Sequence, residues 1–254
     1  MSSASCKSSV LACCILGTSV VVTPGLWTTS WADHQPDPTL DPAMLGVMEE
    51  LGRRADDVRD LTARYEERKH TALLKKPLVT RGRVRIVGTR ARWDADSPRK
   101  TVTLLDPSEV RIYYPERSTV EVYPIGAHLQ FPTVSPLPRW AELREHFRIE
   151  ARSAMEMESK VEPSGYLFLS LTPLRPALRE YVETVDVAID RSSGLLHRAD
   201  ITDPDGDRTI MIFSDARTNT GLASDDLSLD LPAGTLVTWP ISPEKASDSK
   251  AARD

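Results

Sequence analysis

The chain has 254 residues, of which 27% are charged and 40% hydrophobic, and its formal net charge at pH 7 is −5. Arginines are interleaved with carboxylates and form no basic stripe, so the charge pattern does not indicate binding to nucleic acid. The length allows one large domain or two small ones.

The first 32 residues have the features of a secretory signal peptide. Lys7 precedes an uncharged, largely apolar run at residues 10–22, and Ser30-Trp31-Ala32 has small residues at the two positions that a signal peptidase reads. The run is short for a transmembrane helix, so we predict export with cleavage after Ala32, with a retained anchor as the alternative. All three cysteines lie in this segment, which leaves the mature chain without a disulfide or a cysteine nucleophile.

The next elements are a leader, a helix and a first strand. Residues 33–41 have no apolar pattern and are interpreted as a flexible leader. A helix is predicted to begin at Pro42, with Asp41 as its cap. Near Asp57 the period changes to two, which predicts a strand through Tyr65, although a helix that continues to Lys69 is the alternative. The apolar stripe of the helix consists of Met44, Leu45, Met48, Leu51 and Ala55.

Five short strands are predicted within residues 78–124. Apolar side chains recur at every second position, and turn-forming residues separate the runs at 96–98, 106–108 and 115–118. Strands joined by such short links are antiparallel neighbours, so this segment predicts a meander with one apolar and one charged face. The apolar positions are Val84, Ile86, Ala91, Trp93, Ala95, Val102, Leu104, Val110, Ile112, Tyr114, Val120 and Val122.

The second half of the chain again has a helix followed by strands. A helix is predicted to begin near Pro138, with Trp140, Leu143 and Phe147 on its apolar side. A final strand is predicted to pass through Leu227, Leu229 and Leu231. The strands between them are predicted at residues 149–161, 166–172, 181–189, 195–202 and 208–213.

This order of elements predicts an α+β fold, an incomplete, strongly curved antiparallel β-barrel (half-barrel) with helices packed on one side. We expect a single domain over residues 42–240, followed by a disordered tail at residues 241–254. Two domains with a boundary near residues 124–138 are the alternative.

The sequence contains no catalytic or metal-binding constellation. It lacks HExxH, GxSxG, P-loop and GxGxxG motifs, and its five histidines have no ligand spacing. His197 is expected to be a core histidine on the same face as Leu195. The carboxylates at residues 203–207 suit a hairpin turn rather than a calcium loop, because Gly206 comes too early and no glutamate follows at the required distance. We therefore predict no enzymatic activity, no metal and no cofactor.

Methionine and aromatic residues are frequent at the predicted inward positions, where they favour either a plain core or a loose lipid pocket. For any single residue, a core position is the safer interpretation. The residues in question are Met44, Met48, Trp93, Tyr114, Trp140, Phe147, Met155, Met157 and Met211.

Several segments, taken in order, resemble the LolA family of outer-membrane lipoprotein carriers. Arg90-Ala91-Arg92-Trp93 with Pro98 resembles the family's RLRW segment and its proline, and residues 106–123 resemble the following two strands. Residues 203–209, Phe213-Ser214, Asn219 and 229–235 resemble the family's C-terminal pattern, which ends in P.GT. The similarity covers most of residues 44–237.

The resemblance implies that helices close the half-barrel as a lid and that its interior binds the acyl chains of a lipoprotein in transit through the periplasm. It also implies a monomer that meets an inner-membrane release complex and an outer-membrane acceptor. The implied cavity wall and lid are Met44, Leu45, Met48, Tyr65, Trp93, Leu104, Ile112, Tyr114, Val122, Trp140, Leu143, Phe147, Met155, Met157, Leu169, Met211 and Phe213.

The chain departs from the family pattern at two places. Family members commonly have an Arg-Pro pair whose arginine ties the sheet to the lid, and the aligned pair here is Val87-Gly88. Leu227 and Leu229 stand where phenylalanine is usual. The alternative function is an envelope sensor or protein-interaction module of the same fold, with a packed interior that binds no lipid.

Overall fold

The computed structural model describes residues 42–124, 135–154, 157 and 163–240. The predicted signal peptide, leader and tail, and Met155, lie outside the described residues. The longer helices are α1 (Pro42–Asp56) and α2 (Trp140–His146), and α3 (Pro176–Arg179) is a single turn. The strands are β1 Asp60–His70, β2 Leu78–Val87, β3 Arg90–Ser97, β4 Thr101–Leu105, β5 Glu109–Tyr114, β6 Thr119–Pro124, β7 Phe147–Ala151, β8 Tyr166–Pro173, β9 Thr184–Asp190, β10 Leu196–Thr202, β11 Arg208–Thr218 and β12 Leu236–Thr238.

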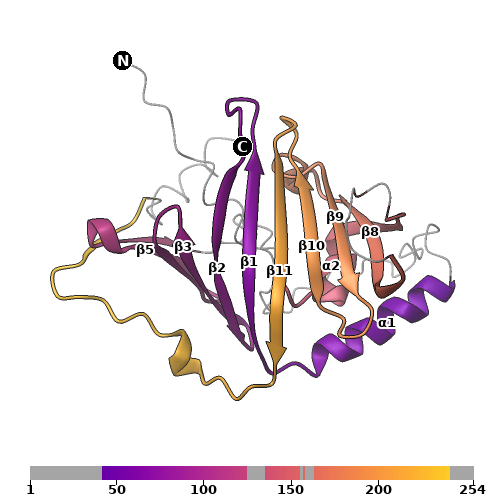
Figure 1. Cartoon of the computed structure of the whole chain (residues 1–254), viewed down its shortest axis with the longest axis horizontal. Helices are drawn as coiled ribbons and strands as arrows, with labels where there is room; N and C mark the ends of the chain where they lie inside the picture. Colours follow the sequence, from indigo (N-terminus) through magenta and orange to yellow (C-terminus); the bar gives the residue numbers. More distant parts are fainter. Residues whose placement is uncertain (1–41, 125–134, 155–156, 158–162, 241–254) are drawn as a thin grey trace, which may run out of the picture.

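All of these strands belong to one sheet, in the order β12-β6-β5-β4-β3-β2-β1-β11-β10-β9-β8-β7. Every described pair of neighbours is antiparallel except β12 and β6, which are parallel. Figure 1 shows that the sheet bends away on both sides of its central strands and stays open, with α1 across the lower ends of β8–β10 and α2 behind the sheet. The predicted curved antiparallel half-barrel is confirmed.

The first strand and the five-strand meander form where they were predicted. β1 follows α1 after three residues, so the alternative of a helix that continues to Lys69 is wrong. In β1 the side chains of Leu61, Ala63 and Tyr65 are buried, and the residues between them are more exposed. This alternation is typical of a strand with one face in the core, which is why the change of period marks the end of the helix.

Two strands of the second half differ from the prediction. The strand predicted at 149–161 is β7, which begins with Phe147 and ends at Ala151. Phe147 is therefore a strand residue rather than a helical one, because α2 ends at His146. The strand predicted from Tyr181 begins at Thr184, after the short α3, and Tyr181 is 39% exposed.

The predicted strand through Leu227, Leu229 and Leu231 is wrong. Residues Ser224–Leu227 form a 3₁₀ helix, and the last strand is β12, beside β6. The backbone here is held by side chains instead of by a strand. Arg85 Nη1 donates to the Asp226 carbonyl at 3.0 Å, and Arg92 donates to the Ser228 carbonyl. The alternating leucines therefore lie on an irregular segment, drawn in yellow in Figure 1, that runs alongside β2 and β3 without joining the sheet there.

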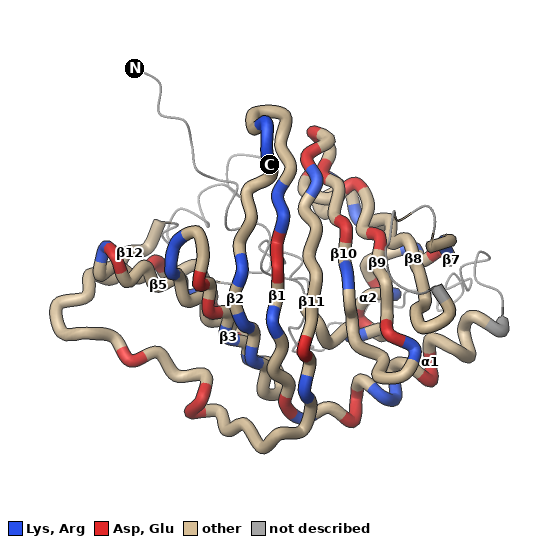
Figure 2. The backbone as a smooth tube through the Cα atoms, viewed as in Figure 1, with Lys and Arg blue, Asp and Glu red and all other residues tan. Residues whose placement is uncertain are grey.

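The two faces of the sheet differ in character. The main core is a cluster of buried side chains between α1, α2 and one face of the sheet, which we call the inner face. The opposite, outer face carries ion pairs such as those of Asp200 with Arg198 and Arg208, and Figure 2 shows charged residues along the central strands. None of the helices in the described ranges is both long and apolar enough to cross a membrane.

Candidate functional site

Three aromatic side chains form the centre of the inner face. Tyr65 of β1 packs edge-on against Trp93 of β3, with ring centroids 4.9 Å apart, and Trp93 lies 6.0 Å from the ring of Phe213 on β11. Tyr65 and Phe213 are directly opposite each other in the β1–β11 ladder. The strand order brings these residues together from distant parts of the chain, and each is at least 93% buried.

The two helices cover this aromatic group and the strands beside it. Met48 and Leu51 of α1 are 2% exposed, and Trp140 of α2 is 6% exposed. Met44 and Leu143 are partly buried and pack against the same cluster. Of the predicted lid residues, only Leu45 is placed outside this cluster, and it is half-buried.

Helix α1 is tied to the β9–β10 turn. Arg54 Nη1 donates to the carbonyls of Arg191 at 2.7 Å and Ser192 at 3.0 Å. Gly194 in this turn has φ +75°, and a Cβ there would lie 2.8 Å from the carbonyl oxygen of Leu51. Glycine therefore permits both the left-handed turn and the close approach of the helix.

Helix α2 is tied to the β2–β3 turn by Arg139. Its Nη2 donates to the carbonyl oxygen of Gly88 at 3.2 Å, and its Nη1 lies 3.4 Å from Glu142 Oε1. Gly88 belongs to the pair that replaces the Arg-Pro of the LolA pattern. Here the arginine lies at the start of α2 and the acceptor lies in the β2–β3 turn, so a helix-to-sheet contact is present with the arginine on the helix side.

Most of the predicted lining residues share the inner face. Directly opposite residues of an antiparallel pair point to the same face. Trp93 is opposite Thr103, and Thr103 is opposite Ile112, so Ile112 and Tyr114 extend this face beyond the helices. Tyr114 donates to Glu121 Oε2 at 3.0 Å. The predicted residues within the main core are Met48, Tyr65, Trp93, Trp140, Phe147, Leu169, Met211 and Phe213.

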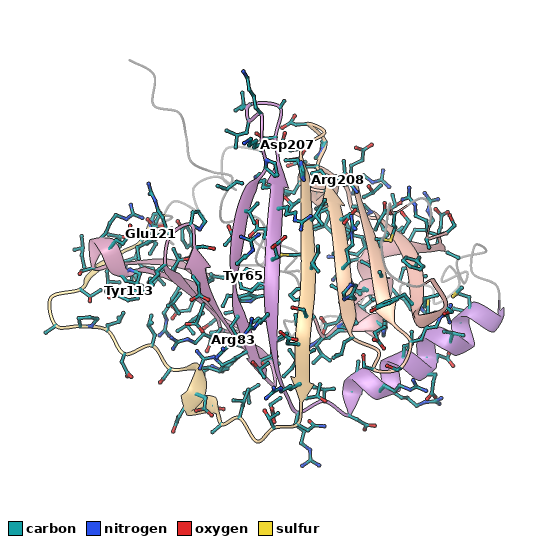
Figure 3. The ribbon with its side chains drawn as sticks, viewed as in Figure 1. Tyr65, Arg83, Tyr113, Glu121, Asp207 and Arg208 are labelled. Atoms are coloured by element: carbon teal, nitrogen blue, oxygen red, sulfur yellow. The ribbon has the colours of Figure 1, made fainter. Side chains whose placement is uncertain are left out.

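Leu104 and Val122 are corrections, because they point to the outer face. Leu104 is opposite Arg92 and Arg111, and Val122 is opposite Arg111. Val122 packs in a small outer cluster with Tyr113 and Val120, against which Leu229 lies. Tyr113 is labelled with Glu121 on this part of the sheet in Figure 3. The C-terminal segment covers this part of the outer face, so apolar side chains are buried on this face as well.

Met157 and His197 also lie away from the inner face. Met157 is 1% exposed and packs with Phe168 and Ala188. The residues on either side of these two in β8 and β9 point to the main core, so Phe168 and Ala188 point to the outer face. The ring of His197 is 5.0 Å from that of Tyr166, which packs on the same outer cluster. The β9–β10 register shifts between Leu196 and Arg198, so the bulge turns His197 outward from Leu195. Burial lowers the pKa of His197.

The inner face contains a cavity of about 40 Å³ next to Trp93. Its apolar lining includes Ile86, Leu105 and Leu137, and Arg139 also lines it. This volume holds only a water molecule or so, so this part of the interior is filled. The indole nitrogens Trp93 Nε1 and Trp140 Nε1 are buried, and neither has a hydrogen-bond partner within the described part of the chain. The sequence could not predict these unpaired indole nitrogens, because the alternation of apolar and polar residues does not reveal hydrogen bonding.

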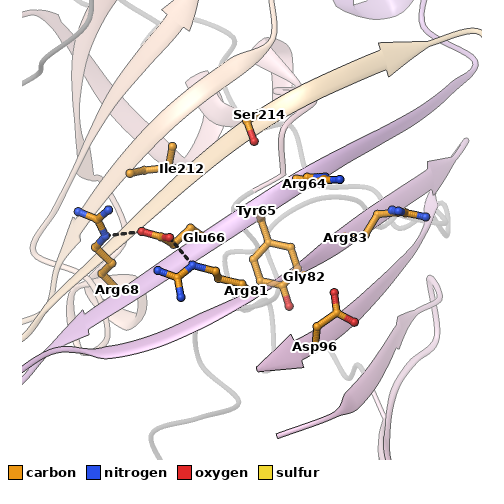
Figure 4. A pocket seen from close by; sticks show the side chains of 10 residues that line it. All are labelled: Arg64, Tyr65, Glu66, Arg68, Arg81, Gly82, Arg83, Asp96, Ile212 and Ser214. Carbon is orange, nitrogen blue, oxygen red and sulfur yellow. Dashed lines mark hydrogen bonds and ion pairs between the residues drawn. The ribbon is translucent and has the colours of Figure 1, made fainter. Parts of the chain in front are cut away.

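A second, polar groove of about 520 Å³ lies on the outer face of β1, β2 and β11 (Figure 4). Arg68 and Arg81 donate to Glu66 at 2.5 Å and 2.6 Å. Burial raises the pKa of Glu66, but the two arginines outweigh it and lower that pKa overall. Arg64 and Arg83 also line the groove, so its arginines exceed its carboxylates.

The turn at residues 203–207 is the predicted hairpin. Asp203 Oδ1 accepts the backbone N–H groups of Asp205 at 3.0 Å and Asp207 at 2.9 Å. Within the described ranges, no group of three His, Cys, Asp or Glu side chains has a geometry that could hold a metal ion.

The sequence matches no protein-family model, and no curated protein matches it either. Solved structures do match. An uncharacterized conserved protein from Thermus thermophilus is 11% identical with a TM-score of 0.50, over 78% of this chain and 99% of that one. A putative outer-membrane lipoprotein-sorting protein domain from Vibrio parahaemolyticus is 17% identical with a TM-score of 0.44, over 72% and 95%.

The MucA/MucB complex of Pseudomonas aeruginosa also matches, with 12% identity and a TM-score of 0.44, over 73% of this chain and 60% of that chain. Identities at this level concern the fold alone. The fold shared with the Thermus thermophilus protein is an open, curved antiparallel sheet with helices on its inner face, and this agrees with the half-barrel that the sequence resemblance implied.

Proposed function

We propose that this protein is an exported, periplasmic carrier that binds the acyl chain of a lipoprotein, or of another lipid, between its two helices and the inner face of the sheet. The proposal includes transfer from an inner-membrane release complex to an outer-membrane acceptor by a monomeric carrier without enzymatic activity. The same inner face would hold the acyl chain once α1 and α2 move aside.

The two buried indole groups are the observation that carries the proposal. Trp93 Nε1 and Trp140 Nε1 are donors inside an apolar cluster, and among the described residues neither has an acceptor. Each unpaired buried donor costs about 1–3 kcal/mol, so an interior selected only for stability has few of them. The ester or amide carbonyl of an acylated ligand would supply an acceptor, which makes these donors useful in a bound state.

The filled interior suits a carrier that must also release its cargo. Burying about sixteen methylenes at about 0.8 kcal/mol each would contribute about 13 kcal/mol, which is nearly irreversible in an empty cavity. In the closed protein Met48, Leu51 and Trp140 already occupy the inner face. The ligand has to displace these side chains, and their loss of burial offsets much of its own gain.

Titration of the purified protein with a dansyl-labelled fatty acid tests this function. The wild type should bind the probe, and Leu143→Glu should weaken binding about tenfold or more, because the new carboxylate would lie partly buried against the apolar cluster. Glu145→Gln, an exposed change on the same helix, is the matched control and should bind as the wild type does.

A wild type that takes up no probe would contradict the proposal and favour the packed sensor or interaction module. Equal binding by the wild type and Leu143→Glu would also contradict it, provided that thermal unfolding confirms that both proteins are folded.

A further inference from the structure

The turn between β1 and β2 exposes an unusual amount of apolar surface. Leu73 is 93% exposed, Leu74 is 52% exposed, and Leu78 at the start of β2 is 45% exposed. A single exposed leucine is ordinary in a soluble protein, but three within six residues at a projecting tip are not. Nothing in the packing of the described residues requires leucine at Leu73.

The same tip carries positive charge. Lys75 and Lys76 directly follow the two most exposed leucines, and both are exposed. The arginines of the polar groove, Arg64, Arg68, Arg81 and Arg83, continue the basic surface along the outer face of β1 and β2. Figure 2 shows basic residues at this tip and along the two strands below it. Exposed leucines beside lysines suit an anionic bilayer, because the leucines can enter the acyl-chain layer while the lysines contact the phosphates next to it.

Hydrogen bonds fix the base of the tip to the end of the sheet. Leu74 N donates to the Thr71 carbonyl at 3.1 Å, and Ala72 N donates to Asp207 Oδ1 at 3.2 Å. The β1–β11 ladder extends to the pair His70 and Arg208, at the end of the sheet where Figure 3 labels Asp207 and Arg208.

The neighbouring β10–β11 turn is acidic, which sets how the tip can meet a membrane. The carboxylates of Asp203 and Asp207 are occupied by backbone N–H groups, and Asp205 is exposed. Figure 1 shows the β1–β2 turn reaching beyond the β10–β11 turn. The leucines therefore reach a bilayer first, and the acidic turn limits the depth of contact.

We propose that the β1–β2 turn is a membrane-contact site that inserts Leu73 and Leu74 into an anionic lipid surface, with Lys75 and Lys76 at the phosphates. A protein partner fits less well, because a projecting turn buries far less than the ~1,200 Å² of a stable protein interface. A membrane needs only the depth of the side chains, and lysine stems reach its phosphate level readily. This site goes beyond the proposed carrier function and does not depend on it.

Vesicle flotation of the purified protein tests the site. The wild type should float with vesicles of phosphatidylglycerol and phosphatidylethanolamine, and less with phosphatidylcholine alone. Leu73→Ser/Leu74→Ser should lower the affinity for these vesicles about a hundredfold, and with it the floated fraction, since each leucine contributes roughly a tenfold change in affinity. Lys75→Ser/Lys76→Ser should lower binding to the anionic vesicles and weaken its salt dependence.

Leu174→Ser/Leu231→Ser is the matched control, because both leucines are exposed elsewhere, at 47% and 40%. This control should float as the wild type does. The proposal is overturned if the wild type stays off anionic vesicles, if the Leu73/Leu74 variant floats equally well, or if the control loses as much. Binding of the dansyl fatty acid by the Leu73/Leu74 variant should be unchanged, which separates this site from the carrier function.

Discussion

At the scale of single residues, the buried polar groups show which side chains hold the fold and which lack partners. Asp60, the first residue of β1, is 5% exposed and accepts hydrogen bonds from Thr220 N, Thr220 Oγ1 and Gly221 N at 2.8, 2.8 and 3.0 Å. It fixes the chain that leaves β11 to the start of β1. Burial raises the pKa of Asp60, but these hydrogen bonds together outweigh burial and lower it overall.

Asp60→Asn tests this connection through its pH dependence. Because the folded-state pKa of Asp60 is lowered, its ionised form stabilises the fold above its ordinary pKa of about 3.9, and this contribution is lost as pH falls through the folded-state pKa. Urea unfolding should therefore show a stability loss in Asp60→Asn that is full at pH 7 and smaller near pH 3. Asp205→Asn, at an exposed turn, should change little at either pH. A loss of equal size at both pH values would sink this explanation.

At the scale of elements, the close approach of β2 to β3 depends on one glycine in β2. A Cβ at Gly82 would lie 2.0 Å from the carbonyl oxygen of Asp94 and 2.9 Å from the Cα of Ala95. The β2–β3 register shifts between Arg81 and Gly82, so the bulge brings the two backbones too close for any side chain.

Gly82→Ala should lower the free energy of unfolding by about 3 kcal/mol, because β2 and β3 must separate to admit the methyl group. Gly46→Ala in α1 is the matched control, since a Cβ there meets nothing within 4 Å. It should stabilise the helix by up to about 1 kcal/mol. Chemical denaturation measures the free energy of unfolding of both variants. If Gly82→Ala had the same free energy of unfolding as the wild type, β2 and β3 would have to admit the methyl group without loss of stability, which would contradict this prediction.

The tie between α2 and the β2–β3 turn is the second element with a testable role. Arg139→Ala removes the hydrogen bond to Gly88, which should cost about 1 kcal/mol of stability and make the lid easier to open. Affinity for the dansyl fatty acid should then rise a few-fold. Arg144→Ala, on the exposed side of the same helix, should leave affinity unchanged. A lower affinity in Arg139→Ala would mean that the arginine contacts the ligand rather than restraining the lid.

At the scale of the whole molecule, one open sheet has covers of different kinds on its two faces. Two helices fill the inner face from β7 to β3, and the C-terminal segment packs on the outer face from β2 to β6. The inner face continues past the helices through Leu105, Val110 and Ile112. Val110 and Ile112 are 6% and 7% exposed, so this part of the apolar wall is buried as well.

The strands and their order in the meander were predictable because alternation has a period of two and the turns are short. The face that each strand turns to the main core could not be predicted, as Leu104 and Val122 show. Both faces of these strands carry apolar residues, so the alternation fits either orientation of a strand. Only the pairing of Thr103 with Ile112 shows which residues of β4 and β5 share the inner face. The irregular course of residues 224–231 was hidden for a related reason: its leucines alternate, but arginine side chains hold its backbone.

The account rests on the inner face as an acyl-binding surface, and the most direct measurement is mass spectrometry of lipids extracted from the protein after purification from its own cell envelope. We predict a stoichiometric acylated species in the wild type that is depleted in Leu143→Glu and retained in Glu145→Gln. Wild-type protein that is consistently free of lipid, and that also fails to bind the dansyl fatty acid, would contradict the account.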